Sequence, residues 1–273
     1  MKQSKATIYE QYGIQYDAKT QKIYHALFGW IRPLLINGND KLGKGVWTYS
    51  TLATNRPYHV TLDTTSGPVD VIMLGTCPCA CEKCYAVRGR YAFENVIKAN
   101  ARKTHISRND LDFMVRAIIA QIKADHITIC RIHASGDFCT NEYIDAWKHI
   151  VKSCPGTIFW TYTKNAAAEK AFDGISNINV VKSIVPGYGF NFGHCDYIIK
   201  TYHALKAIGK KVYICRCGID KKQHCTNCRG CFKNEVVLFI EHSTEYKADQ
   251  DPMYETLKAI IESQDLAIAG KAA

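Results

Sequence analysis

The sequence predicts an α/β protein whose core is an open, partial barrel of about six parallel strands, and two features predict it. Short runs rich in β-branched and aromatic residues recur along the chain, and amphipathic helical patterns lie between most of them. Strands that alternate with helices of this length form a largely parallel sheet with right-handed crossovers. The strand-like runs are residues 69–74, 127–133, 157–162, 178–185, 211–215 and 236–240.

Three segments have the apolar spacing of an amphipathic helix. The first begins near the capping residues Ser107 and Asp110, the second follows Thr140, and the third ends at Gly209. We expect helices at residues 110–124, 141–153 and 197–208.

The remaining segments suggest how the chain is divided. Residues 1–68 do not alternate strands with helices and are interpreted as a loop-rich extension packed on the core. We expect the core to span residues 69–242, with a small cysteine-rich metal-binding segment at 215–231. Residues 243–273 are expected to form a C-terminal helix and tail.

Charge and hydropathy restrict the location of the protein and its partners. The formal net charge of +10 favours contact with something acidic, either an acidic substrate or a nucleic acid. Lysine and arginine are dense from Lys206 to Lys233, although such a stretch is more often a solvated face. No apolar run reaches the length of a membrane helix and none resembles a signal peptide. We therefore expect a cytoplasmic protein without a membrane partner.

Thirteen cysteines in a reducing compartment favour metal binding over disulfides, and nine of them lie in two clusters. In the first cluster, Cys77, Cys81 and Cys84 have C-x3-C-x2-C spacing after an apolar run. Three thiolates can hold a [4Fe–4S] cluster and leave one iron without a protein ligand. The alternative is a structural zinc site, because Cys79 supplies a fourth thiolate. The scattered cysteines are interpreted as small buried apolar residues, and they are Cys130, Cys139, Cys154 and Cys195.

The second cluster combines a C-x2-C-x2-C run, Cys225, Cys228 and Cys231, with a distant cysteine. This ligand set is typical of a fully coordinated [4Fe–4S] cluster, with Cys215 or Cys217 as the fourth ligand. A zinc ion held by four thiolates, or by three thiolates and the His224 imidazole, is an almost equal alternative.

The turn after the predicted strand at 127–133 is a further candidate site. Cofactors of parallel α/β folds bind beyond the carboxyl ends of strands, which is where Ser135, Gly136 and Asp137 lie. Gly136 permits close backbone approach, and Asp137 can accept hydrogen bonds from an amino group. The alternative is an ordinary turn with Asp137 near a helix start.

The order of these features resembles the radical S-adenosylmethionine (SAM) enzymes. Their C-x3-C-x2-C segment follows the first strand, and the next strand ends in a Gly-Gly-Glu-like turn that grips the amino group of the methionine moiety. Turn 135–137 stands in that place, and residues 158–165 resemble the Thr-Asn-Gly strand end of the same enzymes. Two departures are that Lys83 precedes the third cysteine where an aromatic residue is usual, with Tyr85 following it, and that Asp137 replaces the usual Glu.

A closer resemblance, over about residues 35–235, is to the gene product 88 family of phages and plasmids, itself similar to a divergent branch of that superfamily. The shared features are Gly38-Asn39 with Lys41, Cys-Tyr-Ala at 84–86, Ser-Gly-Asp-Phe at 135–138 with Tyr143 and Trp147 downstream, and Tyr-Thr-Lys at 162–164.

The radical SAM resemblance implies an enzyme that cleaves SAM reductively and modifies an unknown substrate, with an electron donor such as flavodoxin or ferredoxin as partner. It implies that the turn 135–137 and Tyr85 contact the cofactor. The alternative is a nucleic-acid-binding protein stabilised by zinc or iron–sulfur, without catalysis. The basic stretch 206–233 suits either function.

Overall fold

The structure is a computed structural model. It divides into two units: Met1–Asn37 with Gly45–Ile178, and Gly38–Lys44 with Asn179–Ala273. These units do not test the domain boundaries expected from the sequence, which stay a prediction. The residues described are 3–38, 42–79, 84–185, 187, 189–220, 224–241 and 246–269.

The main sheet of the first unit is mixed. Strands β5 (Trp47–Ser50), β8 (Ile129–Ser135) and β9 (Ile158–Thr163) run parallel, with Cys130 opposite both Trp47 and Phe159. Strand β4 (Ile36–Asn37) pairs antiparallel with β5, which gives the order β9-β8-β5-β4. The centre of the sheet is therefore built partly from residues that the sequence assigned to the loop-rich extension.

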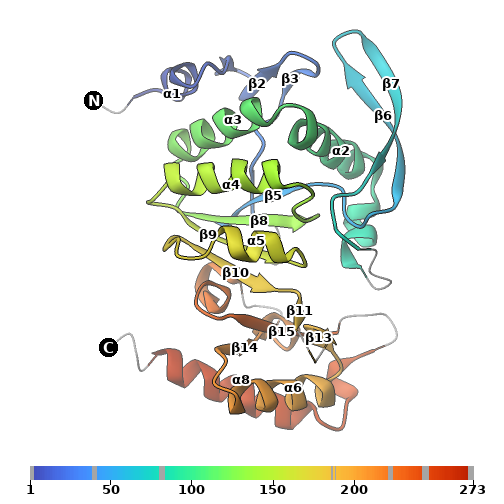
Figure 1. The fold of residues 1–273 in the computed structure, drawn as a ribbon, viewed down its shortest axis with the longest axis vertical. Coiled ribbons are helices and arrows are strands. Elements are labelled where there is room, and N and C mark those ends of the chain that lie inside the picture. Colours follow the sequence, from blue (N-terminus) through green and yellow to red (C-terminus); the bar gives the residue numbers. More distant parts are fainter. Residues whose placement is uncertain are drawn as a thin grey trace. The chain divides into compact units, whose positions relative to one another are not determined.

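The helices of the first unit follow the parallel strands. Helices α2 (Glu94–Asn109) and α3 (Leu111–Ala124) precede β8, α4 (Asn141–Ser153) joins β8 to β9, and α5 (Ala166–Ala171) follows β9. Helix α3 packs against both α2 and α4 (Figure 1). The predicted helices at 110–124 and 141–153 are thus confirmed. The largest fully buried side chains of this core include Tyr49, Met114, Ile118, Phe138, Tyr143, Trp147, Phe159 and Trp160.

The N-terminal residues add a small antiparallel sheet of order β1-β2-β3 to the first unit. Helix α1 packs against α3, and Ser4 caps α1 by accepting a hydrogen bond from the Thr7 amide. These elements are α1 (Lys5–Gln11), β1 (Tyr16–Asp17), β2 (Lys22–His25) and β3 (Gly29–Ile31).

Residues 69–74, predicted as the first strand of the parallel core, lie instead in a two-stranded antiparallel ribbon. Strand β7 (Gly67–Leu74) pairs with β6 (Pro57–Thr64), and Val69 lies opposite Leu62. Several apolar side chains of β7 are exposed, among them Ile72 at 69%. A short apolar run does not reveal which strand it pairs with, and the tight turn before Gly67 directs it back onto β6.

The second unit has its own parallel sheet, of order β13-β15-β14, and its own core, to which α6 and α8 contribute. Strands β11 and β12 form a separate antiparallel pair. The predicted helix at 197–208 is confirmed as part of α6. The elements are β10 (Ile178–Lys182), β11 (Ile184–Val185), β12 (Gly189–Phe190), β13 (Phe192–Gly193), α6 (Cys195–Ala207), β14 (Val212–Ile214), α7 (Cys225–Cys228), β15 (Val236–Ile240) and α8 (Tyr254–Ala269).

The predicted open barrel of about six parallel strands is wrong. The strand-like runs are strands in the structure, but they are distributed over several small sheets, of which one is mixed, one is parallel and others are antiparallel. Only β5, β8 and β9 form the parallel part of the larger sheet in the first unit. The physical reason is that local patterning fixes each strand but not its partner.

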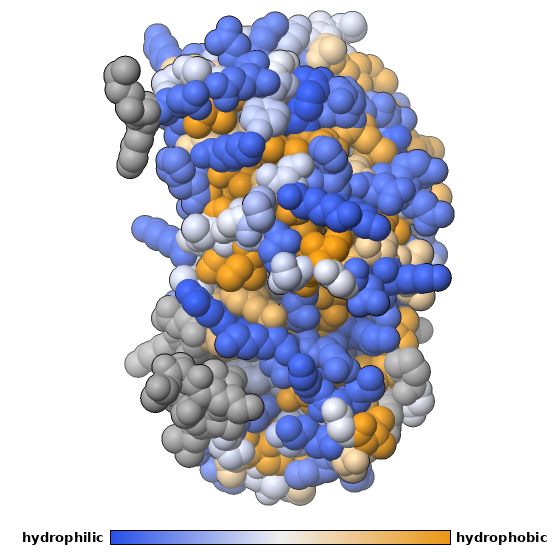
Figure 2. All heavy atoms as spheres, turned by 60° about the vertical axis from the view of Figure 1, so that its left-hand side comes forward, coloured by the Kyte–Doolittle hydropathy of each residue, from blue (hydrophilic) through white to orange (hydrophobic). Residues whose placement is uncertain are grey.

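Two further observations concern the surface and the length of the helices. Figure 2 shows a face covered mainly by hydrophilic side chains, with hydrophobic ones in small areas. In the part of the chain that the structure describes, no helix is both long and apolar enough to span a membrane. Cytoplasmic location stays a prediction.

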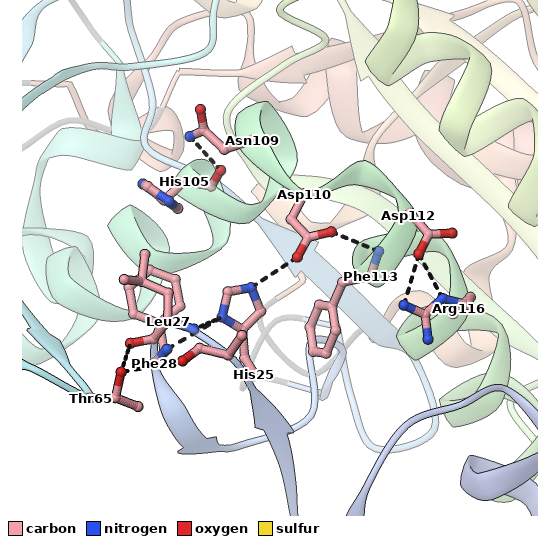
Figure 3. Close-up of polar contacts among 11 residues, drawn as sticks. His25, Leu27, Phe28, Thr65, His105, Asn109, Asp110, Asp112, Phe113 and Arg116 are labelled. Atoms are coloured by element: carbon pink, nitrogen blue, oxygen red, sulfur yellow. Dashed lines mark hydrogen bonds and ion pairs between the residues drawn. The ribbon is translucent and has the colours of Figure 1, made fainter.

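The junction of α2 and α3 is stabilised by Asp110. Its Oδ1 accepts a hydrogen bond of 3.1 Å from the Phe113 amide and so caps α3 (Figure 3). Its Oδ2 lies 3.5 Å from His25 Nε2. Burial lowers the pKa of His25 despite the Asp110 charge, so we expect this imidazole to be neutral at pH 7 and the pair to add little. Nδ1 of His25 accepts the amide hydrogens of Leu27 and Phe28.

Asp110→Ala is expected to lower the free energy of unfolding by about 1 kcal/mol at pH 7, because it leaves the first turn of α3 without its cap. Urea unfolding would measure the change. Asp112→Ala is the matched control, since Asp112 makes only an exposed ion pair with Arg116 one turn along the same helix (Figure 3). Equal losses in the two variants would contradict the capping role.

Candidate functional site

Residues 75–77 follow β7 and are held in place by hydrogen bonds of their backbone. The Thr76 amide donates a hydrogen bond of 2.9 Å to the Leu52 carbonyl, and the Cys77 amide donates one of 3.0 Å to the Thr54 carbonyl. A Cβ atom on Gly75 would lie 1.9 Å from the Ala53 carbonyl oxygen, so only glycine fits there. The position of Cys77 is therefore set by the chain around it and not by its own side chain.

Two buried threonines join this segment to the end of β8. Thr76 Oγ1 accepts a hydrogen bond of 3.0 Å from the Asp137 amide and lies 2.8 Å from Thr51 Oγ1. The Thr51 amide donates to the Ser135 carbonyl, and Ser135 Oγ donates back to the Thr51 carbonyl. The chain after β5, the chain after β7 and turn 135–137 therefore meet at one buried polar cluster. Neither threonine was singled out from the sequence, because threonine at a strand end is too common to be a signal.

Gly136 is constrained by this cluster. It has a φ of +89°, and a Cβ atom there would lie 1.9 Å from Thr51 Oγ1 and 2.6 Å from Thr76 Oγ1. From its place after the predicted strand, this glycine was expected to permit close approach of a cofactor. The two hydroxyl groups supply a reason within the protein itself.

Asp137 is buried, with 1% of its surface exposed, and it ties β8 to β9. Oδ1 accepts hydrogen bonds from the Phe138 amide and the Thr163 hydroxyl, and Oδ2 accepts one from the Lys164 amide. Burial raises the pKa of this carboxyl, and the hydrogen bonds oppose that rise. A carboxylate has about four acceptor positions, and these three hydrogen bonds occupy two on Oδ1 and one on Oδ2.

Cys77 and Cys84 of the first cysteine set lie near this turn. Burial raises the pKa of Cys77 to about 12; the charge of Asp137 adds to that rise, Lys164 opposes it and Cys84 raises it slightly. The structure therefore brings Cys77, Cys84, Asp137 and Lys164 into one neighbourhood. Cys81 lies outside the described residues. Cys79 is half-buried. A bound cation would favour the thiolate that burial disfavours, so the donor chemistry of Cys77 and Cys84 suits a metal.

Tyr85 is held at the same strand end. Its hydroxyl donates a hydrogen bond of 2.6 Å to the Ala134 carbonyl and accepts one of 3.2 Å from Arg131. The residue is 58% exposed and its ring makes an edge contact with Tyr91. The exposed surface of Tyr85 is thus available for contact with a ligand.

A cavity of about 240 Å³ lies next to these segments in the first unit. Two of its lining residues, Leu52 and Thr54, are those whose carbonyls accept hydrogen bonds from the amides of Thr76 and Cys77. The turn after Cys84 and helix α2 form further walls. Ser135 also lines it. Its lining residues include Leu52, Thr54, Arg56, Tyr58, Tyr91 and Asn100. Arg56 and Asn100 line the cavity but belong to no motif, so the linear sequence does not single them out.

His133, at the end of β8, is a packing residue in the structure. It is buried at a φ of +61°, its Nε2 lies 2.8 Å from the Tyr143 hydroxyl, and its ring contacts Phe138 and Trp147. Burial lowers its pKa to about 3, with a smaller contribution from Arg131. The imidazole is therefore neutral at pH 7 and lies in an aromatic core.

The cysteines outside the two clusters largely match their interpretation as buried residues. Cys130, Cys154 and Cys195 are buried, whereas Cys139 is half-buried. Burial raises the pKa of Cys139, and Arg108 opposes the rise. These thiols are thus held in their protonated, unreactive form.

The second cysteine set lies in the second unit, around the end of β14. Tyr213 on β14 places its hydroxyl 3.1 Å from Cys228 Sγ, and its ring leaves no room for a Cβ atom on Gly230. Cys215 follows β14 and its amide donates to the Leu238 carbonyl. Cys225 and Cys228 are the first and last residues of the one-turn helix α7. Cys231 follows in the same segment and is buried. Cys217 is half-buried.

Other groups surround this second set. His224 Nδ1 is buried and has no hydrogen-bond partner among the described residues. The Thr226 amide and hydroxyl both donate to the Leu42 carbonyl, which attaches Leu42 to the cysteine run. Within the described ranges, no three His, Cys, Asp or Glu side chains are grouped so as to hold a metal ion. Coordination of a metal by this second set stays a prediction.

One lysine of the basic stretch 206–233 is paired with an acidic side chain, a contact that the linear sequence does not predict. Lys210 makes an exposed ion pair of 3.1 Å with Glu235 at the start of β15. The expectation of an acidic substrate or a nucleic acid as partner is not tested by this contact and stays a prediction.

Comparison with known proteins identifies one family. A family model described as Gene product 88 matches residues 33–185, a range that contains the first cysteine set and turn 135–137 but not the second cysteine set. Comparisons with curated proteins and with solved structures found no match. Because the matched range makes up more than half of the chain, the protein belongs to the Gene product 88 family.

Proposed function

We propose that this protein is an iron–sulfur enzyme of the radical SAM type, which cleaves SAM reductively in order to modify a substrate. In this proposal Cys77, Cys81 and Cys84 hold a [4Fe–4S] cluster. Such a cluster, when bound, supplies an electron to SAM at an iron that no protein ligand occupies. A flavodoxin or ferredoxin is the proposed electron donor.

The observation that carries the proposal is the convergence of two motifs far apart in the sequence. Cys77 and Cys84 lie in one neighbourhood with Asp137, and the Thr76 hydroxyl joins the cysteine segment to the turn after β8. Cofactors of parallel α/β proteins bind at such strand ends. The adjoining cavity offers space beside this junction.

The chain's own residues have distinct parts in this proposal. Thr51 and Thr76 fix the backbone that carries Cys77 and turn 135–137. Oδ2 of Asp137 is proposed to receive the ammonium group of SAM, while the other hydrogen bonds of this side chain hold the carboxylate in place. Lys164 opposes the rise in the pKa of Cys77 that burial causes, and so works in favour of its thiolate. Tyr85 is proposed to contact the cofactor through its exposed ring.

The second cysteine set is proposed to hold a second [4Fe–4S] cluster or a zinc ion through Cys215, Cys225, Cys228 and Cys231. The buried Nδ1 atom of His224, which lacks a partner among the described residues, supports zinc coordination by three thiolates and one imidazole. In this proposal the second set has a structural role and takes no part in the reaction.

Anaerobically reconstituted protein is expected to contain about eight irons if both sets bind cubane clusters, or about four irons and one zinc otherwise. Addition of SAM and dithionite should then release 5′-deoxyadenosine and methionine, measured by chromatography. Omission of dithionite is the control. Protein that contains zinc alone, with no iron–sulfur absorbance, would contradict the proposal and favour the alternative of a metal-stabilised nucleic-acid-binding protein.

A further inference from the structure

An open cavity of about 400 Å³ lies in the second unit, at the carboxyl ends of two parallel strands. Strands β13 and β15 run parallel, and they end directly before His194 and Glu241 respectively. The Glu241 amide donates a hydrogen bond of 2.8 Å to the Gly193 carbonyl, which holds the two strand ends together. Ligands of parallel α/β sheets bind at such strand ends, and the volume lies within the range of about 300–1,000 Å³ usual for ligand pockets.

Three aromatic side chains, Phe190, Phe192 and Tyr197, form one wall of this cavity, called here the aromatic wall. The rings of Phe190 and Phe192 lie 5.5 Å apart between centroids, at an angle of 31°. The Tyr197 hydroxyl donates a hydrogen bond of 2.8 Å to the Phe190 carbonyl. The Tyr197 ring lies so close to Gly193 that a Cβ atom there would be 2.5 Å from Tyr197 Cδ1. The aromatic wall is thus held in place by contacts within the second unit, and Phe190 is 40% exposed.

The charged side chains of the cavity are acidic. Among the described residues that line it, two are carboxylates, one is a histidine and none is a lysine or an arginine. The Glu241 side chain is only 11% exposed, and its Oε2 lies 3.5 Å from His194 Nε2. The His194 ring is stacked on Tyr246 with 4.0 Å between centroids, which fixes the imidazole beside this carboxylate. A mostly buried carboxylate in an aromatic cavity attracts a cation that can also stack on the rings.

Asp196 also lines the cavity, but its charge has a role within the protein. It lies in the first turn of α6, where a carboxylate offsets the positive end of the helix dipole. Its Oδ2 lies 3.5 Å from Lys200 Nζ, one turn along the same helix. Glu241 is therefore the better placed of the two carboxylates to bind a ligand.

We propose that this cavity binds a guanidinium group, with the Glu241 carboxylate as its counter-charge and the aromatic wall as its stacking surface. A guanidinium is planar, stacks on aromatic rings and donates paired hydrogen bonds to a carboxylate. An ammonium ion is more strongly hydrated and offers no flat surface to the rings. The guanidinium belongs either to a small molecule or to an arginine side chain of a partner peptide. This proposal concerns the second unit alone and does not depend on the proposed radical SAM activity.

Ligand-observed NMR titration of the full-length chain with methylguanidinium tests the proposal. Methylurea is the neutral isostere of this probe, and it is expected to bind at least about tenfold more weakly, because it lacks the charge that Glu241 recognises. Tetramethylammonium is also expected to bind more weakly, since it has no N–H group to donate to the carboxylate. Nα-acetylarginine methylamide distinguishes the two sources. Tighter binding than that of methylguanidinium identifies an arginine side chain of a peptide, and equal or weaker binding identifies a small molecule.

Two variants test the two parts of the recognition. Glu241→Gln is expected to weaken methylguanidinium binding about tenfold to a hundredfold, because it removes the charge and keeps the shape of the side chain. Phe190→Leu is expected to weaken it about two- to fivefold, through loss of one aromatic face. Glu235→Gln is the matched control and should bind as wild type does, since Glu235 pairs with Lys210 at 3.1 Å and is not among the described residues that line the cavity. Thermal unfolding would show that the variants are folded. Because Phe190 is 40% exposed, Phe190→Leu still tests the proposal if Glu241→Gln fails to fold.

Several outcomes would overturn the proposal. Absence of methylguanidinium binding in the millimolar range would show that the cavity does not recognise this group. Equal affinity for methylurea would remove the role of the Glu241 charge, and equal affinity for tetramethylammonium would remove the role of the paired hydrogen bonds. Unchanged affinity in both Glu241→Gln and Phe190→Leu would place any guanidinium site elsewhere in the protein.

Discussion

Alanine at Cys77, Cys81 or Cys84 is expected to abolish iron binding by the first cluster, whereas Cys79→Ala is expected to retain it. An open cubane has three protein ligands, and each thiolate holds a different iron, so loss of any one disrupts the cluster. Cys79 is not needed in that arrangement. The expected iron content of each ligand variant is therefore lower by about four per chain, with the second set unchanged.

The structure makes Cys77→Ala a clean test of ligation. Cys77 is placed by a hydrogen bond from its backbone amide to the Thr54 carbonyl, which alanine retains. We therefore expect the fold to survive, and circular dichroism and thermal unfolding of the cluster-free proteins would check this. Iron and sulfide analysis with electron paramagnetic resonance of the reduced protein measures the cluster itself.

The matched control within the motif is Cys79→Ala. If all four alanine variants lose the metal equally, the set is a closed four-thiolate site, and no iron is left open for SAM. If the variants retain full iron, the metal lies elsewhere in the protein. Either result would overturn the proposed radical SAM activity at this position.

The sequence predicted single elements of the fold better than their arrangement. The helices around Leu111–Ala124 and Asn141–Ser153 are confirmed, since apolar spacing and the caps Asp110 and Thr140 are local signals. The pairing of residues 69–74 was wrong, because a strand's partner depends on the whole chain. Strand β5 has a central place in the sheet despite its short sequence, and its parallel pairing with β8 joins residues about eighty positions apart.

Some residues of the candidate site were likewise predicted from the sequence, and others are recognised only in the structure. Cys77, Cys84, Asp137 and Tyr85 were found because motif spacing or place after a strand is visible in a linear sequence. Thr51 and Thr76 were not, since their role comes from contact between three loops in space. Asn100 and Arg56 are likewise visible only through the cavity that they line.

Gly136→Ala is expected to destabilise the protein by about 3 kcal/mol or more, even without any bound cluster. Two effects add. An L-residue with a φ near +89° is strained, and the new Cβ atom would lie 1.9 Å from the hydroxyl oxygen of Thr51. Thr51 and Thr76 are both buried, so neither hydroxyl can move aside without losing a hydrogen bond.

Gly45→Ala separates the two effects. Gly45 has a φ of +91°, but no atom lies within 4 Å of the position that its Cβ would occupy. Its substitution should cost only the backbone strain, about 1–2 kcal/mol. Urea unfolding of both cluster-free variants at pH 7 gives the difference, which measures the steric contact at Gly136 alone.

The double variant Thr51→Ala with Gly136→Ala tests the identity of the opposing atom. Removal of the Thr51 hydroxyl should make Gly136→Ala less destabilising than it is in the wild-type background, a coupling that a double-mutant cycle isolates. The rescue should be partial, because Thr76 Oγ1 would still lie 2.6 Å from the new Cβ. If Gly136→Ala leaves the cluster-free protein as stable as Gly45→Ala does and weakens only SAM binding, the glycine serves the cofactor and not the threonine cluster.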